Sequence, residues 1–482
     1  MATRRLGASG FFLLLACSEN DVVVGAVADS GSDATGAADV VQDIAVTSPD
    51  TGGAHDVTAL PDTLGFDDVE PLPDVADPID TVIDVGLVDT STVDTSTVDT
   101  STVDASTGDT STGDTSTGDT SDGDVLEADT GPKTIAETCF PGLGPSEAAA
   151  PVYDQFNPVI GSHCSGTNHQ TITGVQKVVF LGDSVTVGTP NDEHLVPTEN
   201  DHYYRNRLAE YLATKFNLNK GDLFGWGAWK SWDYVGFKGS SLQMESGDFK
   251  NCSKFGARTD DFLEGGSQIA QCFPEGGSDK TTLVVFTMGG NDVSSITQKG
   301  GEATPEEVAA GYPALMAQAQ QTADYLDDAI AWLKEPGRFP NGVYVVYANP
   351  FEFTDGSGIT SACKPASIEI PFVGSFDLSA IDINMAEVAG FKEWADKAAQ
   401  AAIVVHLLEE FMRIAVKHQV DMVMMLEQFC GHGFVATGPD ADTTNRCYKG
   451  PDAELWFDIT CFHPSEAGHQ AIFEMFKATI EE

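Results

Sequence analysis

The chain has 482 residues, with 25 Lys and Arg against 74 Asp and Glu, and its formal net charge is −49. A polyanion of this kind is repelled by phosphate backbones, so no nucleic acid is expected as a partner. Residues 18–132 contain 27 acidic residues, no Lys or Arg and few large apolar side chains, which predicts a disordered linker. The composition therefore predicts one globular domain, over residues 133–482.

The first 17 residues have the pattern of a bacterial export signal. Arg4 and Arg5 precede an apolar stretch, residues 6–16, that is too short to span a bilayer. The stretch ends in Leu-Leu-Ala-Cys, which resembles a lipobox, in which Cys17 is lipidated. The alternative is an ordinary signal peptide followed by an incidental cysteine. The lipobox interpretation predicts an exported lipoprotein, anchored by its N-terminal lipid to the outer membrane or cell surface of a bacterium.

The linker contains a five-residue repeat, Asp-Thr-Ser-Thr-Val and then Asp-Thr-Ser-Thr-Gly, from about Asp89 to Gly123. An aspartate every five residues matches neither the period of a helix nor that of a strand, and each repeat adds charge. We therefore interpret residues 18–132 as a solvated acidic spacer rich in Asp, Thr and Ser.

The globular domain begins its regular structure with a short apolar run, residues 176–181, which predicts a buried strand. This run leads directly into Gly182-Asp183-Ser184-Val185-Thr186-Val187-Gly188. A serine on a tight turn at the end of a buried strand has the exposure that a nucleophile requires. Ser184 is therefore the first candidate catalytic residue.

An aromatic-rich segment and two glycine motifs follow. Residues 222–252 include a dense run of six aromatic side chains, which either line an acyl or sugar pocket or pack within an insertion: Phe224, Trp226, Trp229, Trp232, Tyr234 and Phe237. Gly256 then opens the stretch Gly-Ala-Arg-Thr-Asp-Asp-Phe-Leu. A second apolar run, residues 282–288, predicts another buried strand and ends in Gly289-Gly290-Asn291-Asp292.

The rest of the domain alternates between helical and strand patterns. Thr304-Pro305-Glu306-Glu307 is a capping box whose helical pattern continues to about residue 333. Residues 342–347 and 420–426 predict strands, and residues 392–418 predict a helix between them. Buried strands that alternate with helices predict an α/β fold, a three-layer α/β/α sandwich with a mostly parallel sheet.

The last motif is His463-Pro464-Ser465, which precedes a final predicted helix that ends near residue 480. With Ser184, Gly256 and Asn291, it resembles the four motif blocks of the SGNH hydrolases, also called GDSL lipases/esterases, in the family's order. The resemblance covers about residues 176–482 and implies a flavodoxin-like fold. Because Ser184 and His463 lie 279 positions apart, loop insertions are expected.

The resemblance also implies a role for each matched residue. Ser184 is the nucleophile and His463 the general base, with His432 and His469 as rival histidines. The N–H groups of Ser184 and Gly256 and the side-chain amide of Asn291 form the oxyanion hole, with Gly239 and Gly247 as competitors of Gly256. No metal or organic cofactor is implied.

One position departs from the family pattern. The family has an aspartate three residues before the histidine, and this chain has Thr460 there. Three alternatives remain open: Asp458 orients His463, a backbone carbonyl orients it, or the enzyme is impaired. Asp458 is the residue that we favour narrowly.

Eight cysteines remain once Cys17 is set aside, and an even number in an exported chain predicts disulfides. None of them forms a Cys-x-x-Cys pair, so a structural zinc site is not expected. Because short loops close most easily, we expect the pairs Cys252–Cys272 and Cys447–Cys461.

The sequence thus predicts an exported, lipid-anchored serine ester hydrolase of the lipase/esterase or carbohydrate esterase type. Its substrate would be an ester of a lipid or of an acylated glycan. The alternative is a surface binding or adhesion protein that keeps the same fold without efficient catalysis, and Thr460 is the residue that supports this alternative.

Overall fold

The computed structural model describes residues 133–143, 150–188, 202–221, 244–264, 267–363, 367–370, 374–377, 384–438, 441–458 and 460–482. The predicted export signal with Cys17, the acidic linker and residues 222–243 of the aromatic-rich segment lie outside these ranges.

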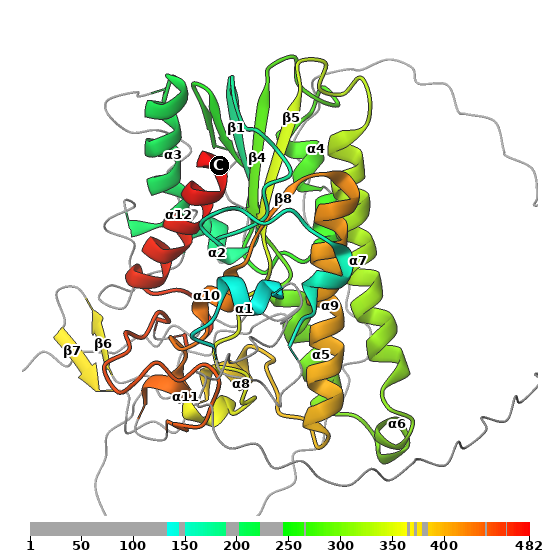
Figure 1. The fold of residues 1–482 in the computed structure, drawn as a ribbon, viewed down its shortest axis with the longest axis vertical. Helices are drawn as coiled ribbons and strands as arrows, with labels where there is room; N and C mark the ends of the chain where they lie inside the picture. The colour runs from blue at the N-terminus through cyan, green and yellow to red at the C-terminus, as the bar shows by residue number, and fades with distance from the viewer. Residues whose placement is uncertain are drawn as a thin grey trace, which may run out of the picture. The chain divides into compact units, whose positions relative to one another are not determined.

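A six-stranded sheet forms the centre of the domain, in the order β2-β3-β1-β4-β5-β8 (Figure 1). The strands are β1 (Lys177–Gly182), β2 (Met244–Ser246), β3 (Phe249–Asn251), β4 (Thr282–Thr287), β5 (Val343–Ala348) and β8 (Asp421–Val423). All neighbours pair in parallel except β2, which is antiparallel to β3 at the edge. Numbered along the chain, the parallel strands follow the order 2-1-3-4-5, which is flavodoxin-like. The predicted fold class is confirmed.

Helices cover both faces of the sheet (Figure 1). α3 (Tyr204–Phe216) and α12 (Glu466–Glu481) pack on one face, and α7 (Pro313–Lys334) and α9 (Lys397–His418) pack on the other. The sheet is therefore the middle of three layers. Among the described residues, no helix has both the length and the apolar character needed to cross a membrane.

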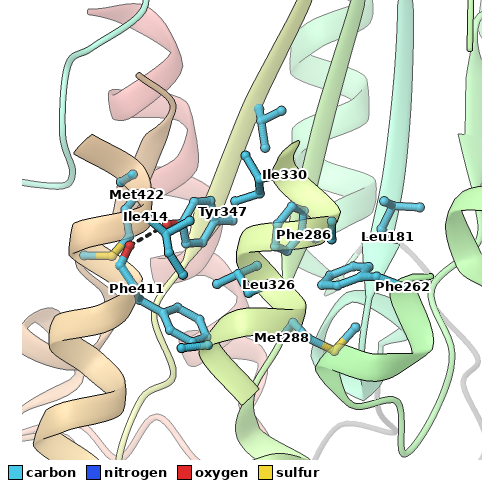
Figure 2. Close-up of a cluster of buried hydrophobic side chains, with 14 of the residues drawn as sticks. Leu181, Phe262, Phe286, Met288, Leu326, Ile330, Tyr347, Phe411, Ile414 and Met422 are labelled. Atoms are coloured by element: carbon cyan, nitrogen blue, oxygen red, sulfur yellow. Dashed lines mark hydrogen bonds between the residues drawn. The ribbon is translucent and has the colours of Figure 1, made fainter. Parts of the chain in front are cut away.

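Alternate side chains of the central strands point to the two faces. In β1, Val178 and Phe180 join the apolar cluster beneath α3 and α12, whereas Val179 and Leu181 join the cluster beneath α7 and α9. Figure 2 shows the second cluster, which includes Leu181, Phe262, Phe286, Met288, Leu326, Ile330, Tyr347, Phe411, Ile414 and Met422. Burial on both faces explains why these strands read as continuous apolar runs.

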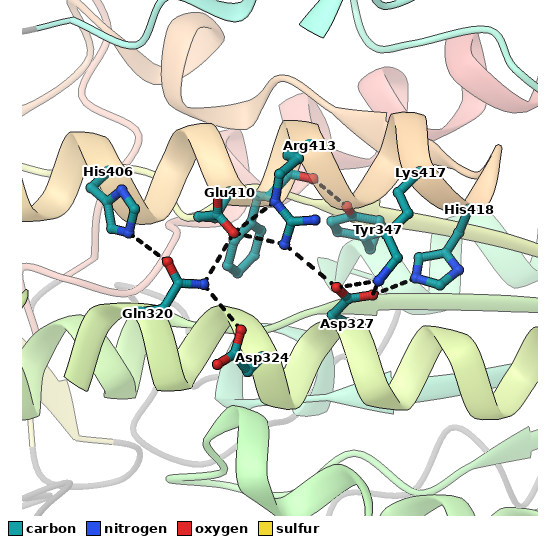
Figure 3. A network of polar contacts seen from close by, with 10 residues as sticks. Gln320, Asp324, Asp327, Tyr347, His406, Glu410, Arg413, Lys417 and His418 are labelled. Atoms are coloured by element: carbon teal, nitrogen blue, oxygen red, sulfur yellow. Dashed lines mark hydrogen bonds and ion pairs between the residues drawn. The ribbon is translucent and has the colours of Figure 1, made fainter. Parts of the chain in front are cut away.

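A polar network joins α7 to α9 (Figure 3). Asp327 on α7 accepts hydrogen bonds from Lys417 at 2.7 Å and from Arg413 at 3.4 Å, and it contacts His418 at 2.5 Å. Burial opposes ionisation of Asp327, but the bonds from Lys417 and His418 outweigh it and lower the pKa of the carboxyl. The network adds polar contacts to the apolar packing between the two long helices.

The helix predicted from residue 305 to residue 333 is interrupted. α6 (Pro305–Ala309) ends before Gly311 and Tyr312, whose φ angles are +75° and +54°, and α7 starts at Pro313. Left-handed residues cannot continue an α-helix, and Pro313 lacks the N–H that a helix interior needs. The expectation of one continuous helix was therefore wrong.

The strand predicted over residues 420–426 is shorter than expected, because β8 ends at Val423. The backbone then turns into α10 (Met425–Phe429). Asn349 Oδ1 accepts hydrogen bonds from the N–H groups of Met425, at 2.7 Å, and Leu426, at 3.1 Å. These two bonds satisfy donors in the first turn of α10, where the helix has no acceptors of its own.

The remaining elements lie in the connections. They are α1 (Ile135–Cys139), α2 (Ser184–Val187), α4 (Gln268–Cys272), α5 (Gly290–Gly301), β6 (Ser367–Ile370), β7 (Gly374–Asp377), α8 (Met385–Val388) and α11 (Phe434–Thr437), with 3-10 turns at Tyr153–Phe156, Thr259–Phe262 and Thr360–Ala362. β6 and β7 form a separate antiparallel hairpin.

Four disulfides join the eight cysteines of the domain. They are Cys139–Cys164, Cys252–Cys272, Cys363–Cys461 and Cys430–Cys447. The predicted pair Cys252–Cys272 is confirmed, and the predicted pair Cys447–Cys461 is wrong. The prediction from loop length failed for Cys461 because the fold brings the distant Cys363 to it. Cys447 lies beside Cys430 instead.

Candidate functional site

The turn that carries Ser184 follows β1 directly. Gly182 has a φ of +119°, and a Cβ atom there would lie 2.3 Å from the carbonyl oxygen of Thr287, so only glycine fits. Asp183 caps the short helix α2, because its Oδ1 accepts hydrogen bonds from Val185 N–H, at 3.1 Å, and from the Thr287 hydroxyl, at 2.8 Å. Burial raises the pKa of Asp183 to about 7. These contacts hold Ser184 at the first position of α2.

His463 lies on a loop whose two ends are joined. Phe457 and Pro464 form an antiparallel bridge, and the N–H of Asp458 donates to the carbonyl of His463 at 2.9 Å. Ser465 is the N-cap of α12 and fixes where the loop ends. The loop is therefore anchored at both ends, which fixes the position of the imidazole.

The two predicted catalytic side chains meet in space. Ser184 Oγ lies 2.8 Å from His463 Nε2, and both residues are buried, at 4% and 5% exposure. Burial lowers the pKa of His463 to about 3, so the imidazole is neutral near pH 7. A neutral imidazole with Nε2 facing a serine hydroxyl can accept its proton.

The other ring nitrogen of His463 contacts Thr460. Thr460 Oγ1 lies 3.0 Å from His463 Nδ1 and 2.5 Å from Asp458 Oδ1. The backbone N–H of Thr460 also donates to Asp458 Oδ1, at 2.8 Å. The sequence left Asp458 or a backbone carbonyl as the group that orients His463. The structure has the Thr460 hydroxyl on Nδ1, with Asp458 bonded to that hydroxyl.

The two remaining motif residues lie on neighbouring loops at the same sheet edge. Asn291, in the first turn of α5, donates its side-chain amide to the carbonyl of Ala257 at 2.9 Å. Asp292 accepts from the N–H and the hydroxyl of Thr259, at 3.2 and 3.1 Å. Gly256, directly before Ala257, has a φ of +70°. The loop after β3 and the start of α5 are thus bonded to each other.

A cavity of about 130 Å³ opens beside Ser184 and His463. Its walls are mostly apolar and come from the segments after β1, β4 and β5, from α9 and from the loop that carries His463: Val185, Val293, Pro350, Phe351, Phe353, Ala389, Phe391, Val404 and Phe462. Asn291 also lines it. A larger cavity of about 620 Å³ shares Val404 and Glu352 with the first and is lined by Val405 and Leu408.

The rival histidines lie elsewhere. His432 stacks on Trp456, with ring centroids 3.5 Å apart, and its Nδ1 contacts the carbonyl of Glu454. His469 is buried on α12 against Tyr203 and Tyr204. Neither ring lines the cavity beside Ser184.

Sequence reasoning treated Thr460 only as a missing aspartate. The pattern Asp-x-Thr could have predicted the contact between Asp458 and Thr460, because an aspartate side chain commonly accepts a hydrogen bond from the backbone N–H two residues later. Among the described residues, no group of three or more His, Cys, Asp or Glu side chains could hold a metal ion.

Two solved structures are similar to the chain. An extracellular lipase from Streptomyces rimosus is 16% identical and has a TM-score of 0.32. A phospholipase A1 from Streptomyces albidoflavus is 14% identical and has a TM-score of 0.34. Each comparison covers 63% of this chain and 99% of the other. Both TM-scores are low, and neither likeness bears on the substrate of this chain.

No curated protein matches the chain. A family model described as GDSL-like Lipase/Acylhydrolase matches residues 178–476, a span that includes Ser184, Gly256, Asn291 and His463. Since this match covers more than half of the 482 residues, the chain belongs to the GDSL-like lipase/acylhydrolase family of ester hydrolases.

Proposed function

We propose that the protein hydrolyses carboxylic esters through a Ser184–His463 pair, and the 2.8 Å contact between Oγ and Nε2 carries this proposal. Ser184 Oγ attacks the ester carbonyl carbon while His463 Nε2 takes the hydroxyl proton. The tetrahedral intermediate then expels the alcohol, which receives that proton. Water attacks the acyl-enzyme by the same route and releases the acid.

Three donors stabilise the negative oxygen of the tetrahedral intermediate in this proposal. They are the N–H groups of Ser184 and Gly256 and the side-chain amide of Asn291. The hydrogen bond from Asn291 to Ala257 supports the assignment, because it holds the amide in place and couples it to the loop that carries Gly256. Loss of one such donor typically costs about 10²–10³ in kcat.

The acyl group of the substrate occupies the 130 Å³ cavity in this proposal. Its walls hold four phenylalanines and three valines beside Ser184 and His463, and each CH₂ group buried there would contribute about 0.8 kcal/mol. This apolar lining favours a fatty acyl ester over an acetylated glycan. The specificity constant is then expected to rise about fourfold for each added CH₂ until the cavity is full.

The alternative of an inactive binding protein depended on Thr460. In the structure the Thr460 hydroxyl contacts His463 Nδ1, at the position where an orienting group is needed. No observation specifically favours a binding function, and we retain the hydrolase as the proposed function.

The test combines a fluorophosphonate probe with a series of p-nitrophenyl esters and acetylated glycans. The wild-type protein should be labelled at Ser184 and should hydrolyse the esters, whereas Ser184→Ala should do neither. Asn291→Ala should keep the label but lose about 10²–10³ in kcat. A folded wild-type protein that takes no label and hydrolyses no ester would contradict the proposal.

The site of action is also proposed. Four disulfides are typical of proteins in oxidising compartments and indicate export. We propose that residues 1–17 direct this export, that Cys17 is lipidated, and that residues 18–132 separate domain 133–482 from the bacterial envelope. Radiolabelled fatty acid should be incorporated into the wild-type protein and not into Cys17→Ser. Equal incorporation in both would contradict the anchor.

A further inference from the structure

The polar contacts around Thr460 assign the proton positions in the site. A threonine hydroxyl has one proton to donate and two lone pairs that accept. Thr460 Oγ1 has three partners: Asp458 Oδ1 at 2.5 Å, His463 Nδ1 at 3.0 Å and the backbone N–H of His463 at 3.3 Å. The number of partners equals the full capacity of the hydroxyl.

Only one distribution of protons satisfies these contacts when Asp458 is ionised. A carboxylate can only accept, so the Thr460 hydroxyl donates to Asp458. The backbone N–H of His463 can only donate, so it uses one lone pair of Oγ1. The contact with Nδ1 then uses the second lone pair, and Nδ1 must carry a hydrogen.

This assignment has a chemical consequence for the other ring nitrogen. A neutral imidazole with its hydrogen on Nδ1 has a lone pair on Nε2. Nε2 faces Ser184 Oγ at 2.8 Å, so the lone pair is aimed at the proton that must be removed. The opposite tautomer would present an N–H to the serine and could not act as a base.

We propose that Thr460 and Asp458 are positioning residues that act in series on His463: Asp458 orients the Thr460 hydroxyl, and that hydroxyl holds His463 in the catalytic tautomer. The inference rests on the proposed Ser184–His463 chemistry. When His463 takes the serine proton, the positive imidazolium keeps its Nδ1–H bond to Thr460. When ionised, Asp458 stabilises that charge through the polarised hydroxyl.

Burial keeps the arrangement free of competing water. Asp458 is 2% exposed, Thr460 7% and His463 5%. The hydroxyl is also held by the chain itself, because the backbone N–H of Thr460 donates to the same Asp458 oxygen. The loop itself therefore holds the Thr460 hydroxyl beside Asp458.

The test uses the full-length protein and two substitutions at Thr460. Thr460→Val keeps the shape and removes the hydroxyl, and we expect a loss of kcat of at least about 10², with KM changed little. Replacement of a triad aspartate by asparagine lowers kcat by about 10⁴, which is the largest loss that we expect for Thr460→Val. Thr460→Ser keeps the hydroxyl and should stay within about threefold of wild type.

A double-mutant cycle tests whether Asp458 acts on His463 through Thr460 or whether the two residues have independent structural roles. Asp458→Asn alone should lower kcat, and Thr460→Val combined with Asp458→Asn should be no worse than the poorer single variant, because residues that act as a unit are not additive. A downfield proton resonance for His463 Nδ1–H should be present in the wild type and in Thr460→Ser and absent in Thr460→Val.

Two outcomes would overturn the inference. One is a folded Thr460→Val protein whose kcat stays within threefold of wild type, and the other is a cycle in which the two losses multiply. Ser184→Ala is measured first: if it retains activity, the proposed function fails. If Ser184→Ala is inactive but Thr460→Val is not, only the inference about Thr460 fails.

Discussion

Cys461 forms a disulfide with Cys363, and Cys461 lies two residues before His463. The bond therefore joins the loop that carries the candidate general base to the segment that follows β5. Both cysteines are buried, at 0% and 2% exposure. This disulfide is the covalent link nearest in sequence to His463, so its loss should disturb the geometry between His463 and Ser184.

We expect the double variant Cys363→Ala/Cys461→Ala to lose both stability and kcat. Removal of a native disulfide typically costs about 2–5 kcal/mol. The matched control is Cys139→Ala/Cys164→Ala, which removes a disulfide outside the site and should lower the melting temperature while leaving kcat near wild type. Equal kcat values for the two variants, measured where both are folded, would show that Cys461 does not position His463.

Gly256 offers a test of the oxyanion hole. Its φ of +70° favours glycine, yet no atom lies within 4 Å of the position that a Cβ would take. Gly256→Ala should therefore strain only the backbone, at a cost of about 1–2 kcal/mol, and shift its N–H enough to lower kcat at least about tenfold.

Gly311 is a matched control for this substitution. It has a φ of +75° and equally open space around a Cβ, but it lies between α6 and α7. Gly311→Ala should cost similar stability without a loss of kcat. Comparable kcat values for both alanine variants in a p-nitrophenyl ester assay would argue against a donor role for Gly256.

The sequence predicted the parts of the fold that depend on local pattern. β1, β4 and β5 are buried on both faces, and this double burial produces the apolar runs that identify them. β2 and β3 were missed because each has three residues and includes a charged side chain, Glu245 or Lys250. Their pairing is a property of the tertiary structure.

Site residues that belong to a sequence motif could be predicted. Site residues whose role depends on contacts in the folded loop could not. Ser184 and His463 were identified from short patterns, although 279 positions separate them. The contact between Thr460 and His463 requires the loop to close between Phe457 and Pro464, which no periodicity reveals. The partner of Cys461 was likewise set by the fold, because loop length favoured Cys447.

Substitution of Val404 tests where the acyl chain of the substrate binds. It lies on α9 and lines the cavity beside Ser184. Val404→Phe should shorten that cavity, so kcat/KM for octanoyl esters should fall at least about tenfold while the value for acetyl esters stays near wild type, in line with about 0.8 kcal/mol for each excluded CH₂. Hydrolysis rates over the acyl series give the comparison.

The adjacent residue supplies the control. Val405 lines the larger cavity and not the one beside Ser184. Val405→Phe should leave the whole acyl series unchanged. A selective loss of long-chain activity in Val405→Phe would instead indicate that the chain extends into the larger cavity.

His469 should make the domain less stable in acid. Its ring is 1% exposed, and neither ring nitrogen has a hydrogen-bond partner within the described residues. Burial lowers the pKa of His469 to about 3, and His463 in its protonated form and the positive charges of Arg207 and Arg205 act in the same direction. The unfolded chain, with a pKa near 6.5, thus binds one more proton than the folded chain between about pH 6.5 and pH 3.

The sign of the effect follows from that difference. Stability from a neutral buried histidine is complete above the unfolded pKa and is lost as the pH falls, by up to about 1.4 kcal/mol for each pH unit. His469→Phe should keep the packing against Tyr203 and Tyr204, and it should flatten the decline in unfolding free energy between pH 6.5 and pH 4. His463 contributes a decline of the same sign that remains in the variant.

His469→Gln is the matched control, because glutamine does not titrate in this range and is not aromatic. Both variants should flatten the pH dependence by the same amount even if their stabilities at pH 7 differ. Urea unfolding at a series of pH values measures the slope, and an ester assay at pH 7 should show kcat within about threefold of wild type for His469→Phe. An unchanged slope in both variants would show that His469 is protonated, or exposed to water, in the folded domain, and a loss of activity comparable to that of Ser184→Ala would make His469 a catalytic residue after all.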